Sequence, residues 1–357
     1  MRQRGIASGK GSPQARGSRG QKKLIAKGDH QYGKDNFFLS CGLPSRLWLL
    51  LAVALYVLTP LFISYSSNAQ RALTYLNYAA PPFSNLSDIS SYLGPDHSGR
   101  AFFVNASQSG QIGTWHVYPK GEEVPSLSNG KPVVVYFHGN AGNRGLRHRV
   151  GLYKLLANLD YHIIAVDYRG FGDSSAIWPT NETVVSDAFD VYQWVRQQAT
   201  GPIFTWGHSL GTGVSVQAAS RLCAQGTCPQ GVVLESAFMS IESAATTHPL
   251  GRPWSWILRF YPSIADLFFQ QWTEQLNSLA TITSVNSPLL LVHSKDDFYI
   301  SYKESERLAS HAQEHRSDRS TVELHLLEGH GHNRIVYAES LPALVQNFVT
   351  TRGKPPK

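Results

Sequence analysis

A serine stands at the centre of the motif with the clearest chemistry in this sequence. Gly207–Gly211 reads Gly-His-Ser-Leu-Gly, a G-x-S-x-G pattern centred on Ser209. It follows an apolar run, Ile203–Trp206, and precedes a run typical of a helix, 210–225. In this strand–turn–helix setting the glycines leave room for a tight turn, and the hydroxyl projects near the positive end of the helix. We therefore predict that Ser209 is a nucleophile.

A second loop can supply hydrogen-bond donors to that serine's reaction. His138–Gly142 reads HGNAG and ends an earlier apolar run. Such a loop offers a backbone N–H to an oxyanion that develops during acyl transfer. We expect the backbone N–H groups of Asn140 and Leu210 to form the oxyanion hole. His138 is expected to shape the loop rather than to act as a base.

A serine hydroxyl also needs a base, and the base needs an acid that orients it. The base is expected after the last strand, where both His330 and His332 stand, whereas His325 lies within the strand. The acid is expected after the preceding strand, where Asp296 and Asp297 are adjacent. The chain order Ser, Asp, His is known for such triads. The residues alone leave both pairs open.

Two other arrangements are less favourable. His162 and Asp167 have a spacing that suggests acyl transfer, but an odd offset on one expected strand points them to opposite faces. The segment Asp167–Gly172 is instead expected to form a turn that packs beneath the serine. Glu235 is the alternative acid, and the Asp pair has the better position.

These side chains must be positioned by strands and helices that alternate from about residue 101 onward. Expected strands are Pro132–His138, Tyr161–Asp167, Ile203–Trp206, Gly231–Glu235, Pro288–His293 and Thr321–Leu327; expected helices lie near 144–159, 181–198, 210–225, 301–315 and 335–350; Ala101–Ala106 and Gly113–Tyr118 are expected to form a hairpin. Continuous apolar strands that are each followed by a helix indicate a mostly parallel sheet with helices on both faces. The predicted fold class is therefore α/β, for a domain that spans 101–350.

A basic tail precedes this domain. Residues 1–46 hold ten Lys and Arg and two Asp and Glu, whereas the rest of the chain holds 22 basic and 23 acidic residues. The overall charge of +7 therefore belongs to the tail, which argues against a nucleic-acid-binding surface on the folded part. The tail is rich in Gly, Ser, Lys and Arg, and we predict that it is disordered.

The segment 47–65 is predicted to be a transmembrane signal anchor. Its first 17 residues carry no charge and would span roughly 25 Å as a helix, near the lower limit for a bilayer core. Trp48 and Tyr65 stand at its edges, where such rings favour the membrane interface. A buried core helix and a cleaved signal peptide are the alternatives. Residues 66–100 are interpreted as a linker.

The charge pattern also predicts a topology. Because positive charges precede the span, the N-terminus is expected in the cytosol and the catalytic domain on the other side. Three sequons, at Asn85, Asn105 and Asn181, agree with that side. Cys223 and Cys228 could pair in an oxidising lumen, which the sequence leaves open. With three cysteines in all, neither a zinc module nor a disulfide-built scaffold is expected, and no metal or organic cofactor is required.

An insertion at about 239–287 interrupts the alternation of strands and helices. Aromatic residues crowd its middle, and among them Trp254, Phe260 and Phe268 are candidate substrate-binding residues. Ordinary core packing explains part of this crowding. The other interpretation is a lid over the serine that binds an acyl chain or enters the bilayer surface.

Several segments together resemble one family. HGNAG, DYRGFGDS, GHSLGTG, VVLESAF, the lid stretch HP…RFYP and HSKDD, with the N-terminal anchor, are similar to the lysophosphatidylserine lipase and monoacylglycerol lipase branch of the α/β hydrolases, the family of α/β-hydrolase domain-containing protein twelve. The resemblance covers roughly residues 95–350. It implies the α/β-hydrolase fold and identifies Asp297 as the acid and His332 as the base. It also implies a single-pass protein of the endoplasmic reticulum membrane with a lumenal catalytic domain.

The sequence is thus expected to encode a membrane-anchored serine hydrolase of single-chain lipid esters, such as lysophosphatidylserine and monoacylglycerols. The expected partners are the lipid substrate and the bilayer. One alternative is a thioesterase acting on acylated proteins, which would need a cytosolic active site. The other is a non-catalytic hydrolase fold that binds a partner.

Overall fold

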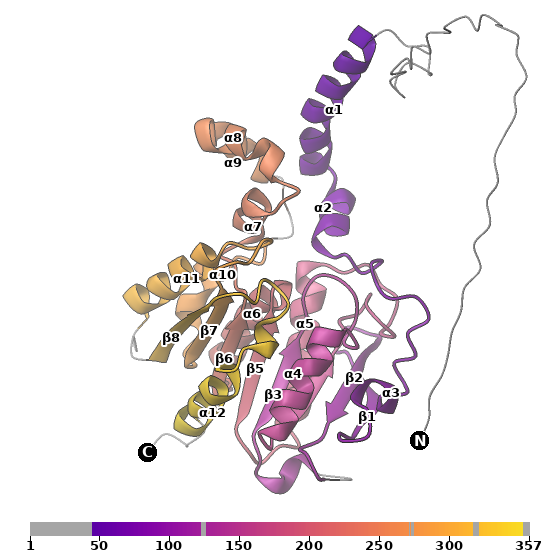
Figure 1. Ribbon diagram of the computed structural model, residues 1–357, viewed down its shortest axis with the longest axis vertical. Coiled ribbons are helices and arrows are strands. Elements are labelled where there is room, and N and C mark those ends of the chain that lie inside the picture. The colour runs from indigo at the N-terminus through magenta and orange to yellow at the C-terminus, as the bar shows by residue number, and fades with distance from the viewer. Residues whose placement is uncertain (1–44, 123–125, 271, 273–274, 317–320, 353–357) are drawn as a thin grey trace, which may run out of the picture. The chain divides into compact units, whose positions relative to one another are not determined.

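The computed structural model describes residues 45–122, 126–270, 272, 275–316 and 321–352 of the 357-residue chain (Figure 1). The chain divides into two units, one that ends at Leu55 and one that begins at Tyr56. The predicted tail 1–46 lies outside the described residues, except for Ser45 and Arg46, which begin the first helix.

Helix α1, Ser45–Tyr65, runs from the first unit into the second. It has 21 residues, and an 18-residue window within it has a mean hydropathy of 2.3, so it is long and apolar enough to cross a membrane. Only 6% of its apolar window is buried, which argues against the alternative of a buried core helix. Membrane insertion itself remains a prediction.

An eight-stranded sheet forms the centre of the second unit. Its strands are β1 Gly99–Asn105, β2 Gln111–Val117, β3 Val133–Phe137, β4 His162–Val166, β5 Ile203–His208, β6 Gly231–Glu235, β7 Leu289–Ser294 and β8 Val322–Leu327, in the spatial order β1-β2-β4-β3-β5-β6-β7-β8. The β1–β2 and β2–β4 pairs are antiparallel and the five other pairs are parallel. The predicted α/β class, the mostly parallel sheet and the hairpin are confirmed.

Helices cover both faces of the sheet. Beyond α1 they are α2 Ser67–Thr74, α3 Ser90–Leu93, α4 Arg147–Asn158, α5 Asn181–Arg196, α6 Leu210–Ala224, α7 Ile241–Thr247, α8 Arg252–Phe260, α9 Pro262–Phe269, α10 Ser278–Thr281, α11 Tyr302–His315 and α12 Leu341–Arg352, with 3₁₀ turns at Leu127–Asn129, Ile282–Ser284 and Ile335–Tyr337. Side chains of α4 and α12 pack on one face, and those of α5, α6 and α11 pack on the other.

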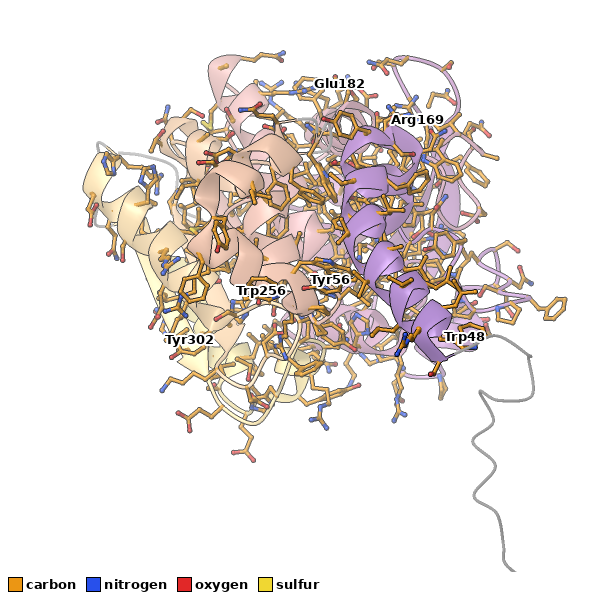
Figure 2. The ribbon with its side chains drawn as sticks, turned by 90° about the horizontal axis from the view of Figure 1, so that it is seen from above. Trp48, Tyr56, Arg169, Glu182, Trp256 and Tyr302 are labelled. Carbon is orange, nitrogen blue, oxygen red and sulfur yellow. A yellow bond between two sulfur atoms is a disulfide. The ribbon has the colours of Figure 1, made fainter. Side chains whose placement is uncertain are left out.

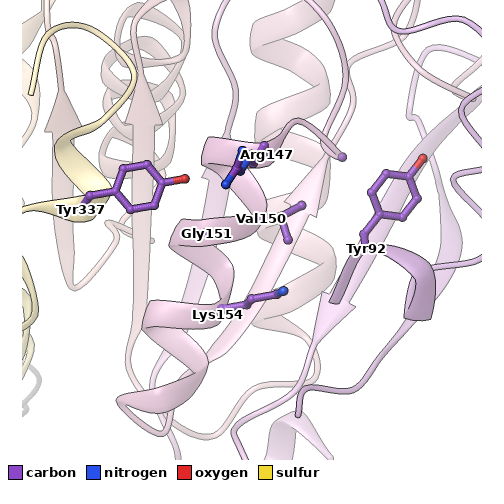
Figure 3. A pocket seen from close by; sticks show the side chains of 7 residues that line it. Tyr92, Arg147, Val150, Gly151, Lys154 and Tyr337 are labelled. Atoms are coloured by element: carbon purple, nitrogen blue, oxygen red, sulfur yellow. The ribbon is translucent and has the colours of Figure 1, made fainter. Parts of the chain in front are cut away.

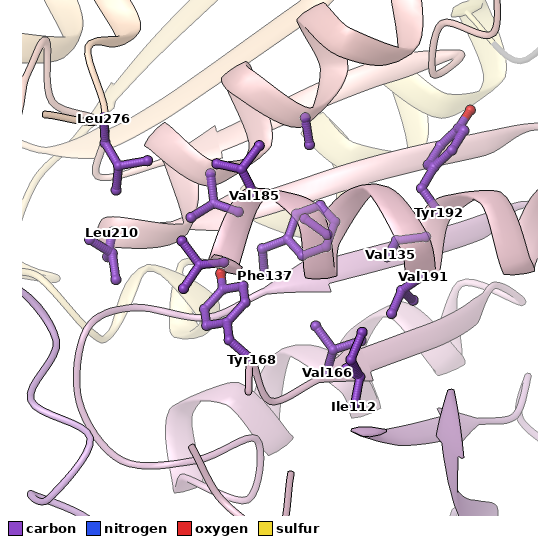
Figure 4. Close-up of a cluster of buried hydrophobic side chains, with 14 of the residues drawn as sticks. Ile112, Val135, Phe137, Val166, Tyr168, Val185, Val191, Tyr192, Leu210 and Leu276 are labelled. Atoms are coloured by element: carbon purple, nitrogen blue, oxygen red, sulfur yellow. The ribbon is translucent and has the colours of Figure 1, made fainter. Parts of the chain in front are cut away.

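The apolar strands are buried on both sides because successive side chains point to opposite faces. In β3, Val135 and Phe137 belong to the core beneath α5 and α6, whereas Val134 and Tyr136 belong to the core beneath α4 and α12. Figure 4 shows the first of these clusters, which extends to Leu210, the residue after the predicted nucleophile. The packed core therefore extends to the residue that follows Ser209.

One predicted helix begins later than expected. Residues 335–350 were expected to form a single helix, but Ile335–Tyr337 is a 3₁₀ turn and α12 begins at Leu341. Pro342 stands in the first turn of α12, where its missing N–H has no helical partner to lose. The proline thus favours a start at this point rather than six residues earlier.

The two cysteines that the sequence left open are paired. Cys223 lies near the end of α6, and a disulfide joins it to Cys228 in the loop that leads to β6. The predicted lid region follows β6 and contains the helices α7 to α10.

Candidate functional site

A strained turn holds Ser209 at the carboxyl end of β5. The residue has a φ of +53° and lies between β5 and α6. Its N–H donates to the carbonyl of Glu235 at 2.9 Å, which ties the turn to neighbouring β6. A Cβ on Gly207 would come within 2.3 Å of the Gly211 carbonyl, and one on Gly211 within 2.0 Å of the Phe137 carbonyl. Both glycines are therefore required by close backbone approach, as the motif predicted.

The structure brings Ser209, His332 and Asp297 together from the ends of three strands. His332 Nε2 lies 3.0 Å from Ser209 Oγ, and His332 Nδ1 lies 2.6 Å from Asp297 Oδ2. The Asp297 side chain is fully buried, and that of His332 is 11% exposed. This is the geometry in which an imidazole can take a proton from a serine while a carboxylate orients the ring.

Asp297 is held as a carboxylate. Burial alone would raise its pKa, but hydrogen bonds from His293 and His332 outweigh burial and hold its pKa well below the usual range. Its second oxygen accepts the backbone N–H groups of Tyr299 at 2.8 Å and Ile300 at 3.0 Å. The side chain is therefore ionised at neutral pH and fixed in orientation.

The neighbouring Asp296 has a different set of partners. Its carboxylate accepts the backbone N–H groups of Gly329 at 2.9 Å and Gly331 at 3.1 Å, together with the Ser294 hydroxyl. The hydrogen bond from Ser294, helped by the backbone donors, lowers the pKa of Asp296 to about 2. Asp296 thus fastens the loop that leads to His332 and does not itself contact the imidazole.

The remaining candidate bases and acids lie elsewhere. His330 binds Ser294 Oγ through its backbone N–H, at 3.2 Å. His325 is on β8, with Nε2 3.9 Å from Glu323. Glu235 accepts the indole N–H of Trp206 at 2.8 Å, and burial raises its pKa to about 7.

Two histidines that the sequence analysis missed lie against the triad. The ring of His208, the second residue of the G-x-S-x-G motif, donates from Nε2 to the backbone carbonyl of His332 at 3.0 Å. The His148 ring packs 5.5 Å from that of His208. Burial lowers the pKa of His208 well below its ordinary value and that of His148 to about 3, so both are neutral. The sequence signal for His208 is its position directly before Ser209, where the G-x-S-x-G pattern allows any residue type.

The loop after β3 lies against the nucleophile. A Cβ built on Gly139 would lie 3.3 Å from the Ser209 Cβ, so the segment that contains Asn140 runs beside the serine. Leu210 is the first residue of α6, so its N–H has no partner within the helix. Both predicted oxyanion donors are thus near Ser209, and their role remains a prediction.

His138 shapes this loop, as expected from the sequence. Its ring is fully buried, Nδ1 donates to the Gly139 carbonyl at 2.6 Å, and Nε2 lies 3.3 Å from Asp167. Burial lowers the pKa of His138. Asp167 also binds Arg144 at 2.6 Å, whereas His162 pairs with His116 at 2.9 Å. His162 and Asp167 therefore serve separate networks, as their offset predicted.

The three predicted lid residues have different surroundings. Trp254 is half-buried, and its indole N–H donates to the carbonyl of Tyr56 at 2.8 Å. Phe260 is 69% exposed at the end of α8. Phe268 packs against Trp272 and the core beneath α5 and α6. Their role in substrate binding remains a prediction.

A separate surface pocket of about 360 Å³ lies along α4 (Figure 3). It is lined by Tyr92, Gly145, Arg147, Val150, Gly151, Lys154 and Tyr337, and none of the triad residues lines it. Among the residues that the structure describes, no group of three or more His, Cys, Asp and Glu side chains is arranged to hold a metal ion.

The predicted glycosylation sites differ in accessibility. Asn85 and Asn105 are exposed, whereas Asn181 is half-buried in the first turn of α5. Asn85 and Asn105 are therefore the better acceptors, since a glycan needs an open surface.

Comparison with known proteins agrees with this geometry. Residues 132–254 match the model of the alpha/beta hydrolase fold family. The chain is 32% identical to lysophosphatidylserine lipase ABHD12 of Danio rerio over 85% of its length and 82% of the relative, and 32% identical to the Xenopus tropicalis protein of the same name over 89% and 86%. Protein ABHD12B of Homo sapiens is 30% identical over 70% and 72%.

The chain belongs to the ABHD12 family of α/β hydrolases. Solved structures agree on the fold of this ABHD12-family chain. An esterase of Pyrococcus furiosus superposes with a TM-score of 0.59 at 17% identity, covering 77% of this chain and 98% of the esterase. An alpha-beta hydrolase of Vibrio vulnificus gives 0.58 at 14% identity, with 80% and 92% covered. The resemblance drawn from the sequence motifs is confirmed.

Proposed function

We propose that this protein is a membrane-anchored serine hydrolase that cleaves the carboxylic ester of single-chain lipids through an acyl-enzyme. The substrates are lysophospholipids, with lysophosphatidylserine foremost, and monoacylglycerols. The observation that carries the proposal is the continuous set of contacts from Ser209 Oγ through His332 to Asp297. The ABHD12 relatives, which are named as lysophosphatidylserine lipases, support the choice of a phosphoserine head group.

The proposed mechanism uses only groups of this chain and water. Ser209 Oγ attacks the ester carbonyl while His332 Nε2 takes its proton, and the backbone N–H groups of Asn140 and Leu210 stabilise the oxyanion. His332 then delivers the proton to the leaving alcohol of the glycerol. Water attacks the acyl-enzyme by the same route and releases the fatty acid. Asp297 keeps the imidazole in the tautomer that can accept the proton.

We place the enzyme in the endoplasmic reticulum membrane, with a cytosolic N-terminus and a lumenal catalytic domain. The basic residues before α1 support this orientation. The Cys223–Cys228 disulfide supports an oxidising compartment. A glycosidase that removes N-linked glycans should increase the mobility of the wild-type protein, and the Asn85→Gln/Asn105→Gln variant should lack most of that shift. An unglycosylated protein would favour a cytosolic domain and, with it, the thioesterase alternative.

The nucleophile is tested by labelling microsomes with a fluorophosphonate probe, with lysophosphatidylserine added as competitor. We expect wild-type protein to be labelled, Ser209→Ala to be unlabelled, and the lipid to reduce the wild-type signal. If labelling requires Ser209 but is not reduced by the lipid, the protein is still a serine hydrolase, and lysophosphatidylserine is not its substrate. Absence of labelling in folded wild-type protein would overturn the catalytic mechanism.

The base is tested by a matched pair of variants. His332→Ala should lose labelling and ester hydrolysis, whereas His330→Ala, two residues earlier in the same loop, should keep both. Equal loss in the two variants would contradict the assignment, because it would show that the loop, and not the imidazole of His332, determines activity.

A further inference from the structure

Hydrogen bonds join the lid helix α8 to one residue of α1. The indole N–H of Trp254 donates to the backbone carbonyl of Tyr56 at 2.8 Å, and that of Trp256 donates to Tyr56 Oη at 2.8 Å. The Tyr56 hydroxyl in turn donates to the carbonyl of Pro253 at 2.5 Å. The rings of Tyr56 and Trp254 stack with centroids 5.4 Å apart. We call these contacts the Tyr56 clasp; Figure 2 shows Tyr56 beside Trp256.

The sequence of α1 leaves a carbonyl open for this clasp. In a helix the carbonyl of residue 56 normally accepts the N–H of residue 60. Residue 60 is a proline within α1, so it has no N–H to donate. The indole of Trp254 supplies the missing donor. Pro60 therefore creates the acceptor that α8 uses.

The clasp has the properties required of a contact in hydrocarbon. Both indole N–H groups and the phenol O–H are used, and each meets an acceptor within the clasp. In lipid an unpaired polar group is costly because no water can replace the partner, so such closed sets join helices there. In water the same groups would be hydrated without any need to meet.

The position of Tyr56 along α1 sets the depth of the clasp. Tyr56 lies nine residues before Tyr65, the end of α1, which is about 14 Å along a helix axis. The hydrocarbon core of a bilayer is about 30 Å thick. If α1 spans the bilayer, Tyr56 lies close to its middle, and the part of α8 that touches Tyr56 lies at the same level.

Exposed aromatic and aliphatic side chains cover much of the outer surface of α8 and α9, which also carries the exposed charged residues Arg259 and Asp266. Trp256, Phe260, Tyr261 and Ile264 expose between 49% and 69% of their surface. The Arg252 side chain, at the start of α8, turns away to the carbonyl of Phe298 on the catalytic domain. The Arg259 guanidinium lies over the Phe260 ring, 5.9 Å from its centroid.

We propose that α8 and α9 lie in the hydrocarbon of the same bilayer as α1, held there by the Tyr56 clasp. The inference rests on the proposed membrane span but not on ester hydrolysis. It makes the lid a membrane-embedded element, fastened to the anchor by a carbonyl that Pro60 leaves free.

The depth of α8 can be measured by nitroxide labelling of the full chain in lipid nanodiscs. Single cysteines at Phe260→Cys, Leu58→Cys and Lys120→Cys in a Cys41→Ser background would report the lid, the anchor and the aqueous surface. We expect the ratio of oxygen to nickel-chelate collision rates at Phe260 to match that at Leu58 and to exceed that at Lys120 several-fold. An aqueous ratio at Phe260 with a lipid ratio at Leu58 would overturn the embedded lid and leave the anchor intact. Aqueous ratios at both would overturn the anchor as well.

The clasp is tested by variants in the Phe260→Cys background. Pro60→Ala restores an N–H that competes for the Tyr56 carbonyl, and Trp254→Phe keeps the stacked ring but removes the donor. Both should shift the Phe260 label toward the aqueous ratio, while fluorophosphonate labelling of Ser209 shows that the domain is folded. Leu61→Ala, in the same helix, is the control and should cause no shift. An unchanged ratio in Pro60→Ala and Trp254→Phe would overturn the role of the clasp.

Discussion

The carboxyl edge of the sheet and the helices α8 and α9 hold polar groups in different ways. At the sheet edge, carboxylates accept several donors each, as the buried Asp297 and the exposed Asp296 do. In α8 the indole N–H groups of two tryptophans meet at Tyr56, while neighbouring rings are exposed. The first region is built to fix atoms for chemistry, and the second is built to present apolar surface. The two regions should therefore respond differently to substitution.

The largest effect is expected for Asp297→Asn at the sheet edge. An amide cannot hold the imidazole in the productive tautomer, so kcat should fall by about 10⁴-fold. The measurement is steady-state hydrolysis of lysophosphatidylserine, with thermal unfolding as the check of folding. A loss of less than tenfold in folded protein would show that another group orients His332.

The next effect concerns stability rather than rate. Glu235 is neutral in both folded and unfolded states at low pH, but burial raises its folded pKa to about 7 from an ordinary value of 4.5. As the pH rises above about 4.5, Glu235 ionises in the unfolded state but stays protonated in the folded state until about pH 7. The free energy of unfolding should therefore fall by about 3 kcal/mol by pH 8. Glu235→Gln cannot ionise and should lose that part of the pH dependence. Parallel curves of melting temperature against pH for the two proteins would contradict the prediction.

Asp296→Asn tests whether the adjacent carboxylate only positions the loop. Its oxygens accept the backbone of Gly329 and Gly331, so the variant should misplace His332 slightly and lower kcat roughly 10- to 100-fold. The comparison with Asp297→Asn is made in the same assay. Equal losses in both variants would remove the distinction between the two carboxylates.

The smallest effect is expected in α8. Phe260→Ser removes an exposed ring that we expect to enter lipid, and KM for lysophosphatidylserine in vesicles should rise by about tenfold. Hydrolysis of a soluble short-chain ester should stay unchanged. Phe103→Ser, which removes a 48% exposed ring from β1, is the matched control and should change neither value. Equal changes with the soluble and the vesicle substrate would place Phe260 at the catalytic centre instead.

Much of the fold could be predicted from the sequence because its strands are apolar on both faces and its turns carry glycine. The G-x-S-x-G motif located Ser209, and the expected order of strands narrowed the base to His330 or His332 and the acid to Asp296 or Asp297. They could not choose within a pair, because adjacent loop residues differ only in where the backbone turns their side chains. The choice of Asp297 and His332 came from the family resemblance.

Two features had no local pattern that could reveal them. The bond from His208 to the His332 carbonyl joins residues 124 apart, and the one from Trp254 to Tyr56 joins residues 198 apart. Each depends on the packing of whole elements. Pro60 gives no local sign of this contact, since the donor that replaces its N–H lies in another helix.

The strand order has a consequence for the biosynthesis of the enzyme. Ser209 precedes His332 by 123 residues, and β8, which leads to that histidine, is the edge strand of the sheet. At a translation rate of about 5–20 residues per second, Ser209 is made roughly 6 to 25 seconds before His332. A nascent chain that stops before β8 therefore lacks His332 and leaves β7 as the edge strand of the sheet. With the proposed roles of Ser209 and His332, hydrolytic activity begins only once the loop after β8 has been made.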